Sequence, residues 1–199
     1  TNASHLLISA APSDQGDPFL NAIDLARYEF SWVGYLSTTG VYGNHDGAWV
    51  DETAQLTPAT QRGIYRVQAE AAWTATKLPV HIFRLAGIYG PGRGPFAKVR
   101  NGTARRIIKP GQMFSRIHAE DIAQVVAASI AKPRPGAIYN LCDDDPAPPQ
   151  DVLAYAAQLL NVPLPPLLNF ETADMTPRAR SFYAENKRVK NNLIKSELN

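Results

Sequence analysis

The chain has 199 residues, enough for a sizeable core, and its 45% hydrophobic content is typical of a folded globular protein. Its 20 basic and 18 acidic residues give a formal charge of only +2 and are spread along the chain, which argues against a nucleic-acid partner. No run of 18 apolar residues could span a membrane, and the single cysteine, Cys142, excludes an internal disulfide and favours a reducing, cytoplasmic location.

The first predicted elements in chain order are a buried strand and a short helix. Residues 6–11 form a continuous apolar run, as strands of parallel sheets do, and small polar residues follow. Asp17 is a suitable helix N-cap, and Pro18 suits the first helical position. The segment 19–30 has apolar residues at helical spacing, so we predict an amphipathic helix there.

Three further segments complete a β-α-β-α-β order. Strands are predicted over residues 32–36 and 79–85, and a helix with an apolar stripe over 58–76 lies between them. The connections are long enough for right-handed crossovers between parallel strands. The predicted fold class is therefore α/β, with a Rossmann-like parallel sheet. The chain starts without Met and almost directly on an apolar run, so we expect a fragment whose sheet is incomplete at the N-terminus.

The composition changes about midway, where glycine, proline and basic residues become frequent. Beyond this change we predict a helix over 121–131, a strand over 137–141 that returns to the sheet, and a helix over 150–160. The chain is therefore divided into a partial cofactor domain, residues 1–90, and a mixed C-terminal part, residues 91–199, that supplies a small α+β substrate lobe.

Hydroxyl side chains directly follow the second predicted strand. Ser37, Thr38 and Thr39 come after an apolar run and before Gly40. Because the carboxyl ends of strands hold the ligand in open α/β sheets, these hydroxyls are candidates for binding one. The glycine-rich phosphate loop that normally accompanies such a site is not found in this sequence, since residues 90–94 have three glycines without the full spacing.

Five segments resemble a known family in their order and spacing. They are residues 36–43 (Leu-Ser-Thr-Thr-Gly-Val-Tyr-Gly), 49–52 (Trp-Val-Asp-Glu), 66–70 (Arg-Val-Gln-Ala-Glu), 83–92 (Phe-Arg-Leu-Ala-Gly-Ile-Tyr-Gly-Pro-Gly) and 117–123 (Ile-His-Ala-Glu-Asp-Ile-Ala). They are similar to the extended short-chain dehydrogenase/reductase superfamily, in its NAD-dependent epimerase/dehydratase branch. The resemblance implies a Rossmann-like fold and a nicotinamide cofactor, either NAD or NADP, which a form truncated at the N-terminus need not bind.

Such enzymes use a Ser or Thr hydroxyl and a Tyr-x-x-x-Lys pair. The lysine lowers the pKa of the tyrosine and holds the nicotinamide ribose, and the tyrosine exchanges a proton with the substrate oxygen as hydride moves. The resemblance places Thr38 at the hydroxyl position. It also implies that strand ends line the cofactor, namely at Ser9, Ala10, Ala11, Ser37, Leu85 and Ala86.

The tyrosine–lysine pair is replaced in this chain. Counting back from Glu70 places Arg66 at the lysine position and Arg62 at the tyrosine position. Arg66 can hold the ribose or phosphate of a cofactor, but it cannot tune a tyrosine as an ammonium group does. Tyr65 lies about one helical turn from Arg62 and is a substitute proton carrier. We therefore predict Thr38, Tyr65 and Arg66 as catalytic residues, with a water held by the two arginines as the alternative.

Further departures bear on the substrate. Many sugar-nucleotide members of the family have asparagine where Gly87 stands and arginine where Phe114 stands, and Arg116 is the alternative cation. We predict a small-molecule substrate with a hydroxyl or carbonyl group, and a sugar nucleotide is one option. Its predicted contacts are Thr39, Arg62, Gly87 and Arg116.

Other candidate chemistries are weaker. Residues 183–187 spell Tyr-x-x-x-Lys but lie far from Thr38 in sequence, so we interpret the spelling as coincidence. The favoured interpretation of His118 is a packed imidazole, and that of Cys142 is a buried thiol at a strand end. The aspartates at 143–145 are expected to lie in a solvated turn, so no metal site is predicted.

Two functions stay open at this point. The first is an NAD(P)-dependent epimerase, dehydratase or reductase, which the retained Thr38 favours. The second is a non-catalytic Rossmann-like binding or sensor module, or an inactive truncated family member, which the arginines at 62 and 66 favour. A homo-oligomer is also expected, either through the edge that an incomplete sheet exposes or by dimerisation of the helix that carries Tyr65.

Overall fold

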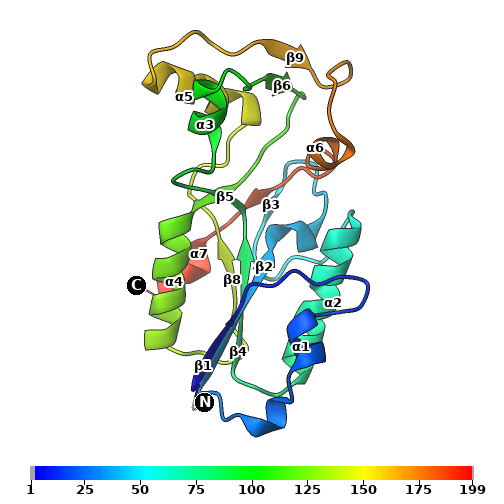
Figure 1. The fold of residues 1–199 in the computed structure, drawn as a ribbon, viewed down its shortest axis with the longest axis vertical. Helices are drawn as coiled ribbons and strands as arrows, with labels where there is room; N and C mark the ends of the chain where they lie inside the picture. Colours follow the sequence, from blue (N-terminus) through cyan, green and yellow to red (C-terminus); the bar gives the residue numbers. More distant parts are fainter. Residues whose placement is uncertain (1–2, 199) are drawn as a thin grey trace.

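The structure, a computed structural model, describes residues 3–198 and centres on a parallel four-stranded sheet (Figure 1). The strand order is β1-β2-β4-β8, with β1 at His5–Ile8, β2 at Trp32–Thr38, β4 at Val80–Leu85 and β8 at Ile138–Leu141. All three neighbouring pairs are parallel. The predicted α/β class with a Rossmann-like parallel sheet is therefore confirmed.

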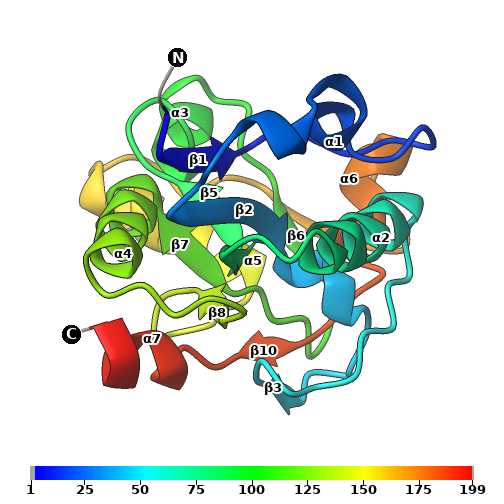
Figure 2. The same cartoon turned by 90° about the horizontal axis from the view of Figure 1, so that it is seen from below.

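Helices cover both faces of this sheet. On one face lie α1, Pro18–Ala22, and α2, Gln61–Ala75; on the other lie α4, Ala119–Ala131, and α7, Asn192–Leu198 (Figure 2). Each face has its own apolar cluster, one including Trp73 of α2 and the other including Val126 of α4. A parallel sheet needs this double cover because its strands are apolar on both sides.

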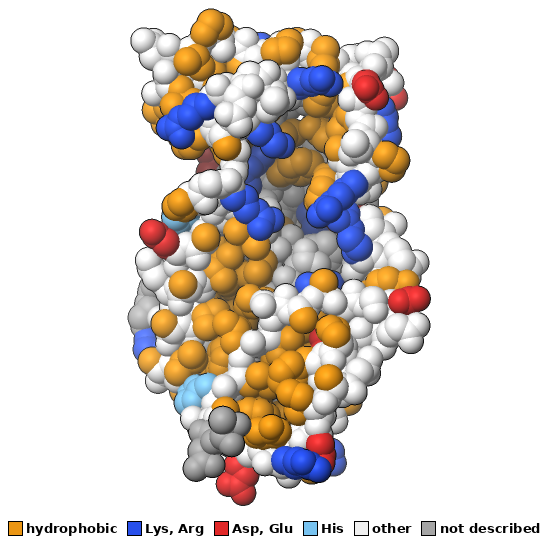
Figure 3. Space-filling view, viewed as in Figure 1, with side chains coloured by type: hydrophobic (Ala, Val, Ile, Leu, Met, Phe, Trp, Pro, Cys, Tyr) orange, Lys and Arg blue, Asp and Glu red, His pale blue; other side chains and the backbone are white. Residues whose placement is uncertain are grey.

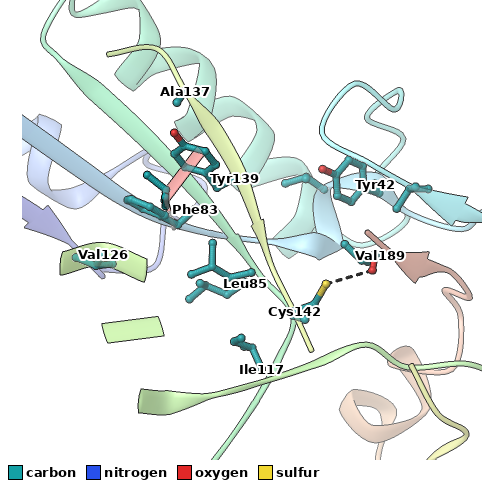
Figure 4. Close-up of a cluster of buried hydrophobic side chains, with 14 of the residues drawn as sticks. Tyr42, Phe83, Leu85, Ile117, Val126, Ala137, Tyr139, Cys142 and Val189 are labelled. Atoms are coloured by element: carbon teal, nitrogen blue, oxygen red, sulfur yellow. Dashed lines mark hydrogen bonds between the residues drawn. The ribbon is translucent and has the colours of Figure 1, made fainter. Parts of the chain in front are cut away.

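The side chains of β4 alternate between the two clusters. Val80 and Ile82 join the cluster beneath α2, whereas Phe83 and Leu85 join the one beneath α4 (Figure 4). This alternation follows from the two-residue period of a strand. It also aims Arg84, the charged residue of this fully buried strand, toward α2.

A smaller lobe lies above the carboxyl edge of the sheet (Figure 1). It contains α3, Pro95–Arg100, α5, Pro149–Leu159, and α6, Pro177–Ser181, together with a short parallel pair, β6 at Arg106–Ile108 and β9 at Leu167–Asn169. Two small apolar clusters of its own hold it together. We call this part the upper lobe.

Short strand pairs join the upper lobe to the sheet. β5, Gly87–Tyr89, continues from the end of β4 and pairs with β7, Arg116–His118, while β3, Trp49–Val50, pairs with β10, Arg188–Val189. The C-terminal part of the chain thus returns to the sheet with β8, α4 and α7, and its remaining segments build the upper lobe and these joints.

The first predicted helix differs from the structure. The segment 19–30 is broken: α1 ends at Ala22, and Asp24 begins a separate 3-10 turn, η1, at Leu25–Arg27. The Asp24 carboxylate accepts a hydrogen bond from a backbone N–H two residues on, and such local bonding competes with helix continuation. The strand predicted over 6–11 is also shorter. The predicted N-cap and first-turn proline of α1 are confirmed.

Candidate functional site

The predicted strand-end residues are brought to one edge of the sheet. Thr38, the last residue of β2, is in register with Leu85, the last residue of β4, and the exposed Ser9, Ala10 and Ala11 follow β1. A hollow separates this part of the molecule from the upper lobe, and Lys and Arg side chains surround it (Figure 3). Thr38 therefore ends an interior strand of the parallel sheet, at the edge above which the upper lobe lies.

The Thr38 side chain ends β2 by capping the turn that follows. Its Oγ1 accepts a hydrogen bond of 3.1 Å from the Gly40 N–H, at the start of the 3-10 helix η2, Thr39–Tyr42. Thr38 is half-buried, and within residues 3–198 its hydroxyl hydrogen has no acceptor, so it can donate to a ligand. Thr39, predicted to contact substrate, is instead buried.

Gly63 allows α2 to approach this turn closely. A Cβ on Gly63 would lie 3.0 Å from the Gly40 carbonyl oxygen and 2.8 Å from Cβ of Pro58, distances that side chains do not tolerate. Thr60 caps the helix by accepting from the Gly63 N–H at 3.2 Å. The first turn of α2, which carries Arg62, is thereby fixed beside η2.

A buried ion pair lies beneath the candidate site. Arg84 Nη2 donates to Glu70 Oε2 at 2.8 Å, and the two side chains are only 3% and 5% exposed. Burial alone lowers the pKa of Arg84, but the hydrogen bonds and charge of Glu70 raise it overall, so Arg84 stays charged. The Ser37 hydroxyl donates to the same carboxylate. Ser37, predicted to contact the cofactor, is thus buried, and its hydroxyl is already hydrogen-bonded to Glu70.

Tyr42 extends this pair to the far strand. Its hydroxyl accepts from Arg84 Nη1 at 3.0 Å and donates to Asn140 Oδ1 of β8 at 2.7 Å. Burial raises the pKa of Tyr42, so its phenol remains protonated and able to donate. We call Ser37, Glu70, Arg84, Tyr42 and Asn140 the buried network. It connects α2, η2 and three strands below the sheet edge.

The side chains of Leu85 and Ala86, predicted to line the cofactor, belong to the apolar core. Both are buried in the cluster beneath α4, as Figure 4 shows for Leu85. Only their backbone could reach a cofactor. Both residues lie at the predicted edge of the sheet, but the prediction overlooked that β4 is covered on both faces.

Arg66, at the lysine position, is bonded to β2. Its Nη1 donates to the Leu36 carbonyl at 2.7 Å and to the Tyr35 hydroxyl at 3.0 Å. Its guanidinium carbon also lies 5.5 Å from the centroid of the Tyr35 ring, within the range of a cation–π contact. Arg66 is half-buried at the carboxyl end of β2, near the predicted position of the ribose.

Arg62, at the tyrosine position, reaches the upper lobe. Its Nη2 donates to Ser181 Oγ at 3.3 Å, and its guanidinium carbon lies 5.2 Å from the centroid of the Phe182 ring. Both contacts involve exposed groups, so Arg62 joins α2 to the end of α6 across the cleft. A substrate role for Arg62 would require it to exchange these contacts for a ligand.

Tyr65 is half-buried on α2 between these two arginines. Within the described part of the chain its hydroxyl makes no hydrogen bond. The phenol is therefore available for a ligand, but no neighbouring cation is bonded to it as lysine is in a Tyr-x-x-x-Lys pair.

Arg116 and Gly87 lie on the paired strands β7 and β5 rather than at the end of β2. Arg116 Nη1 donates to the carbonyls of Phe114 at 3.0 Å and of Ala147 at 3.1 Å, and burial lowers its pKa. A Cβ on Gly87 would meet the Ser115 carbonyl at 3.4 Å. Arg116 thus holds two loops together, and part of its hydrogen-bonding capacity is already used.

His118 packs as expected and belongs to a second polar cluster. Its Nδ1 caps α4 by accepting from the Glu120 N–H at 3.3 Å, and its ring packs edge-on against Tyr89 at 5.2 Å. The Tyr89 phenol is hydrogen-bonded to Asp143; burial and this carboxylate raise the pKa of Tyr89 to about 12. Asp143 also interacts electrostatically with Asp121, and burial raises its pKa.

The tail segment that spells Tyr-x-x-x-Lys has a structural role. Tyr183 is buried between Phe114 and Phe170, at centroid distances of 5.5 Å and 5.1 Å. Lys187 Nζ donates to the Gly43 carbonyl at 2.8 Å and pairs with Glu185 at 2.7 Å. The two residues therefore do not form a tyrosine–lysine pair, and Lys187 fixes the loop after η2.

The remaining candidate features show no reactive site. Cys142 is buried, its Sγ donates to the Val189 carbonyl at 3.2 Å (Figure 4), and burial raises the pKa of its thiol to about 12. Among residues 3–198, no three His, Cys, Asp or Glu side chains gather as metal ligands would. In the same part of the chain, each helix is too short or too polar to cross a bilayer.

No role was predicted for Arg84 or Glu70 from the sequence alone, although the position of Arg84 in the sequence is informative. Arg84 is a charged residue inside an apolar strand, and such a residue needs an opposite charge when the strand is buried. In the sequence analysis Glu70 served only as the position from which the predicted tyrosine and lysine positions were counted. Pairing the two would have required knowing that α2 lies over β4.

Comparisons with known proteins agree with this architecture. No family model matches the chain. It is 64% identical to a conserved protein of unknown function from Silicibacter pomeroyi, whose solved structure it matches with a TM-score of 0.92 over 98% of this chain and 71% of that one. It is 35% identical over 176 residues to Protein YeeZ of Escherichia coli K12, a match that covers 82% of this chain. The chain spans 61% of the length of that curated relative.

An enzyme of known activity shares the fold. The dTDP-glucose 4,6-dehydratase of Streptomyces venezuelae, solved with NAD bound, matches with a TM-score of 0.70 at 19% identity over 85% of this chain and 54% of the enzyme. A putative NAD-dependent epimerase/dehydratase from Methylobacillus flagellatus also matches, with a TM-score of 0.64 at 26% identity over 86% of this chain and 59% of that one. The chain belongs to the extended short-chain dehydrogenase/reductase superfamily, in its NAD-dependent epimerase/dehydratase branch.

Proposed function

We propose that the chain is part of an NAD(P)-dependent epimerase, dehydratase or reductase that acts on a hydroxyl or carbonyl compound. The observation that carries the proposal is the position of Thr38 at the end of the central strand β2, below the cleft between sheet and upper lobe. Ligands of open α/β sheets bind at this edge. A related fold carries NAD in the dehydratase from Streptomyces venezuelae.

The residues at this edge fit a nicotinamide nucleotide. Arg66 has N–H donors without a partner in residues 3–198, and the Thr38 hydroxyl can still donate. The exposed backbone of residues 9–11 lies at the neighbouring strand end. In this proposal Arg66 and residues 9–11 hold the cofactor, which when bound supplies hydride transfer.

The proposed chemistry of the chain is proton transfer at a substrate oxygen. Thr38 donates a hydrogen bond to that oxygen and orients it. Tyr65 exchanges its phenol proton with the same oxygen, or a water held by Arg62 and Arg66 does so. A sugar nucleotide is one candidate substrate, and the cationic groups around the cleft suit an anionic one.

Titration with NADH and NADPH, followed by nucleotide fluorescence, tests the proposal on the chain as given. Saturable binding of either nucleotide is expected, and Arg66→Ala should weaken it at least tenfold, because the proposed ribose donors are lost. Arg178→Ala removes an exposed arginine of α6 and serves as the control. Absence of binding to both nucleotides would contradict the proposal.

A non-catalytic binding or sensor module is the second candidate. Arg62 favours it, because a residue at the tyrosine position is here engaged with Ser181 and Phe182 of the upper lobe. The two candidates differ in hydride transfer. An enzyme should oxidise NADH or NADPH with at least one compound from a panel of carbonyl substrates, and Tyr65→Phe should slow it about 100-fold or more. A module should bind nucleotide without turnover.

We also propose that the chain self-associates through β1. The outer edge of β1 has no strand partner among residues 3–198, and Leu7 on this strand is 48% exposed. Unpaired strand edges with apolar side chains invite pairing with a second copy, and lysine blocks it. Light scattering should show oligomers that Leu7→Lys dissociates, with the exposed Leu159→Lys as control. A monomer at all concentrations would contradict this proposal.

A further inference from the structure

Arg66 and Tyr35 form a contact that the sequence pattern did not indicate. Arg66 Nη1 is shared between the Tyr35 hydroxyl, at 3.0 Å, and the Leu36 carbonyl, at 2.7 Å. Both acceptors belong to consecutive residues of β2, immediately before the hydroxyl pair Ser37-Thr38. One nitrogen of the guanidinium is therefore fixed to the strand that carries the site.

Tyr35 is a rigid partner for this bond. Its side chain is fully buried and packs near Trp73 of α2 at a ring-centroid distance of 6.3 Å. Asp17, also buried, interacts electrostatically with the phenol. Without Arg66 this phenol would lose a charged donor in an apolar setting, and such a loss is unfavourable. The contact therefore constrains the arginine more than an exposed tyrosine would.

The rest of the guanidinium stays available. Arginine has five N–H donors, and both hydrogen bonds within residues 3–198 leave from Nη1. The donors on Nε and Nη2 remain, and the side chain is half-buried rather than enclosed. A lysine has one nitrogen with three donors, so bonding to both Tyr35 and Leu36 would leave it a single donor for a ligand.

We propose that Tyr35 is a positioning residue of the candidate site, which holds Arg66 by Nη1 so that Nε and Nη2 bind the ligand. The ligand class is the hydroxyls or phosphate of a nicotinamide nucleotide, and this part rests on the proposed function. Arginine can be anchored and bind at the same time, which gives a physical reason for arginine at the position of the family lysine.

Chemical modification of Arg66 tests the anchor without any cofactor. Phenylglyoxal reacts with accessible guanidinium groups, and mass spectrometry gives the rate at each arginine. Tyr35→Phe should raise the rate at Arg66 at least threefold relative to the exposed Arg27. The control is Tyr139→Phe, because Tyr139 is equally buried and its hydroxyl donates to Glu197 at 2.9 Å, away from the site. Equal Arg66 rates in wild type and Tyr35→Phe would overturn the proposal.

Nucleotide titration tests what the anchor does. Tyr35→Phe should weaken NADH or NADPH binding about tenfold, with Tyr139→Phe unchanged, and unaltered affinity in Tyr35→Phe would overturn the proposed role. If Tyr35→Phe did not fold, Arg66→Lys replaces it: weaker binding supports the proposal and equal or tighter binding contradicts it. A wild-type chain that binds neither nucleotide would refute the proposed function, and the modification rates would still decide the role of Tyr35.

Discussion

The two halves of α2 differ in how firmly the structure specifies their residues. In the second half, here called the deep end, Glu70 is 4% exposed and receives hydrogen bonds from both Arg84 and Ser37. In the first half, here called the open end, Arg62 is exposed and makes two contacts with the upper lobe. A buried charge must have its partner, whereas an exposed one can be exchanged without loss of the fold.

This difference allows the chain to keep its α/β fold with arginine at positions 62 and 66. The buried network holds α2 on the sheet by contacts that involve neither Arg62 nor Arg66. Residues 62 and 66 can then be exchanged for other side chains without loss of the fold. If the comparison is right, substitutions at the deep end should affect stability, and those at the open end should mainly affect binding.

The largest effect is expected for Glu70→Ala, which leaves Arg84 charged and unpaired in the core. Removal of one partner of a buried pair destabilises a protein by about 3–5 kcal/mol. Urea denaturation gives the free energy of unfolding. Arg27→Ala, which breaks a pair with 78% and 59% exposed side chains, is the matched control and should change it by less than about 1 kcal/mol.

A double substitution distinguishes lost pairing from lost packing. Glu70→Leu with Arg84→Met removes both charges and should be less destabilising than Glu70→Ala, because no isolated charge remains. Similar unfolding free energies for Glu70→Ala and Arg27→Ala would show that the deep end is not specified by its ion pair, and the comparison would fail.

Gly63→Ala should be destabilising although alanine is the better helix former. The added Cβ would lie 2.8 Å from Pro58 Cβ and 3.0 Å from the Gly40 oxygen, so α2 must move away from η2. Such overpacking lowers the free energy of unfolding by about 1–3 kcal/mol, against a helical gain of about 1 kcal/mol. Gln68→Ala, on the exposed side of α2, is the control. A more stable Gly63→Ala variant would mean that α2 and η2 are not in close contact.

An alkaline titration tests how much burial of the protonated Tyr35 phenol, which Arg66 of α2 contacts, contributes to stability. Burial raises the pKa of Tyr35 to about 12, above its unfolded value of about 10. The folded form keeps the proton longer, so this stabilisation is complete below pH 10 and is lost as the pH rises to 12. Between these limits the wild type should lose about 2–3 kcal/mol more than Tyr35→Phe. Tyr155→Phe, at a 61% exposed residue, should follow the wild type throughout.

The sequence was sufficient for the fold because its signals are local and repeated. Apolar runs at 32–36 and 79–85 and an amphipathic helix between them predict parallel strands with a crossover, and the structure has them. The hydroxyls at the end of β2 correctly indicated the edge of the sheet. The helix predicted over 19–30 was wrong because apolar spacing alone does not show that Asp24 starts a new turn.

The candidate site was only partly predictable, because its contacts are not local in sequence. Ser37 and Thr38 are neighbours of similar chemistry, yet one is bonded to Glu70 in the core and the other keeps a free donor. The anchor of Arg66 on Tyr35 joins residues 31 positions apart. Which hydroxyl faces the ligand and which nitrogen is anchored depend on the packing of α2 against β2, and no periodicity encodes this.

The smallest effect on stability is expected for Arg62→Ala, although this residue links α2 to the end of α6. Its hydrogen bond to Ser181 and its contact with Phe182 lie among exposed groups, where a cation–π pair contributes about 0.5–1 kcal/mol. Urea denaturation should show a change of this size, and the exposed Arg178→Ala on α6 should show less. Proteolysis near α6 should become faster in Arg62→Ala, because the upper lobe loses a contact while the sheet keeps its core. If Arg62→Ala lowered the free energy of unfolding by more than about 2 kcal/mol, the open end of α2 would also stabilise the fold. Its residues could then not be exchanged without loss of stability.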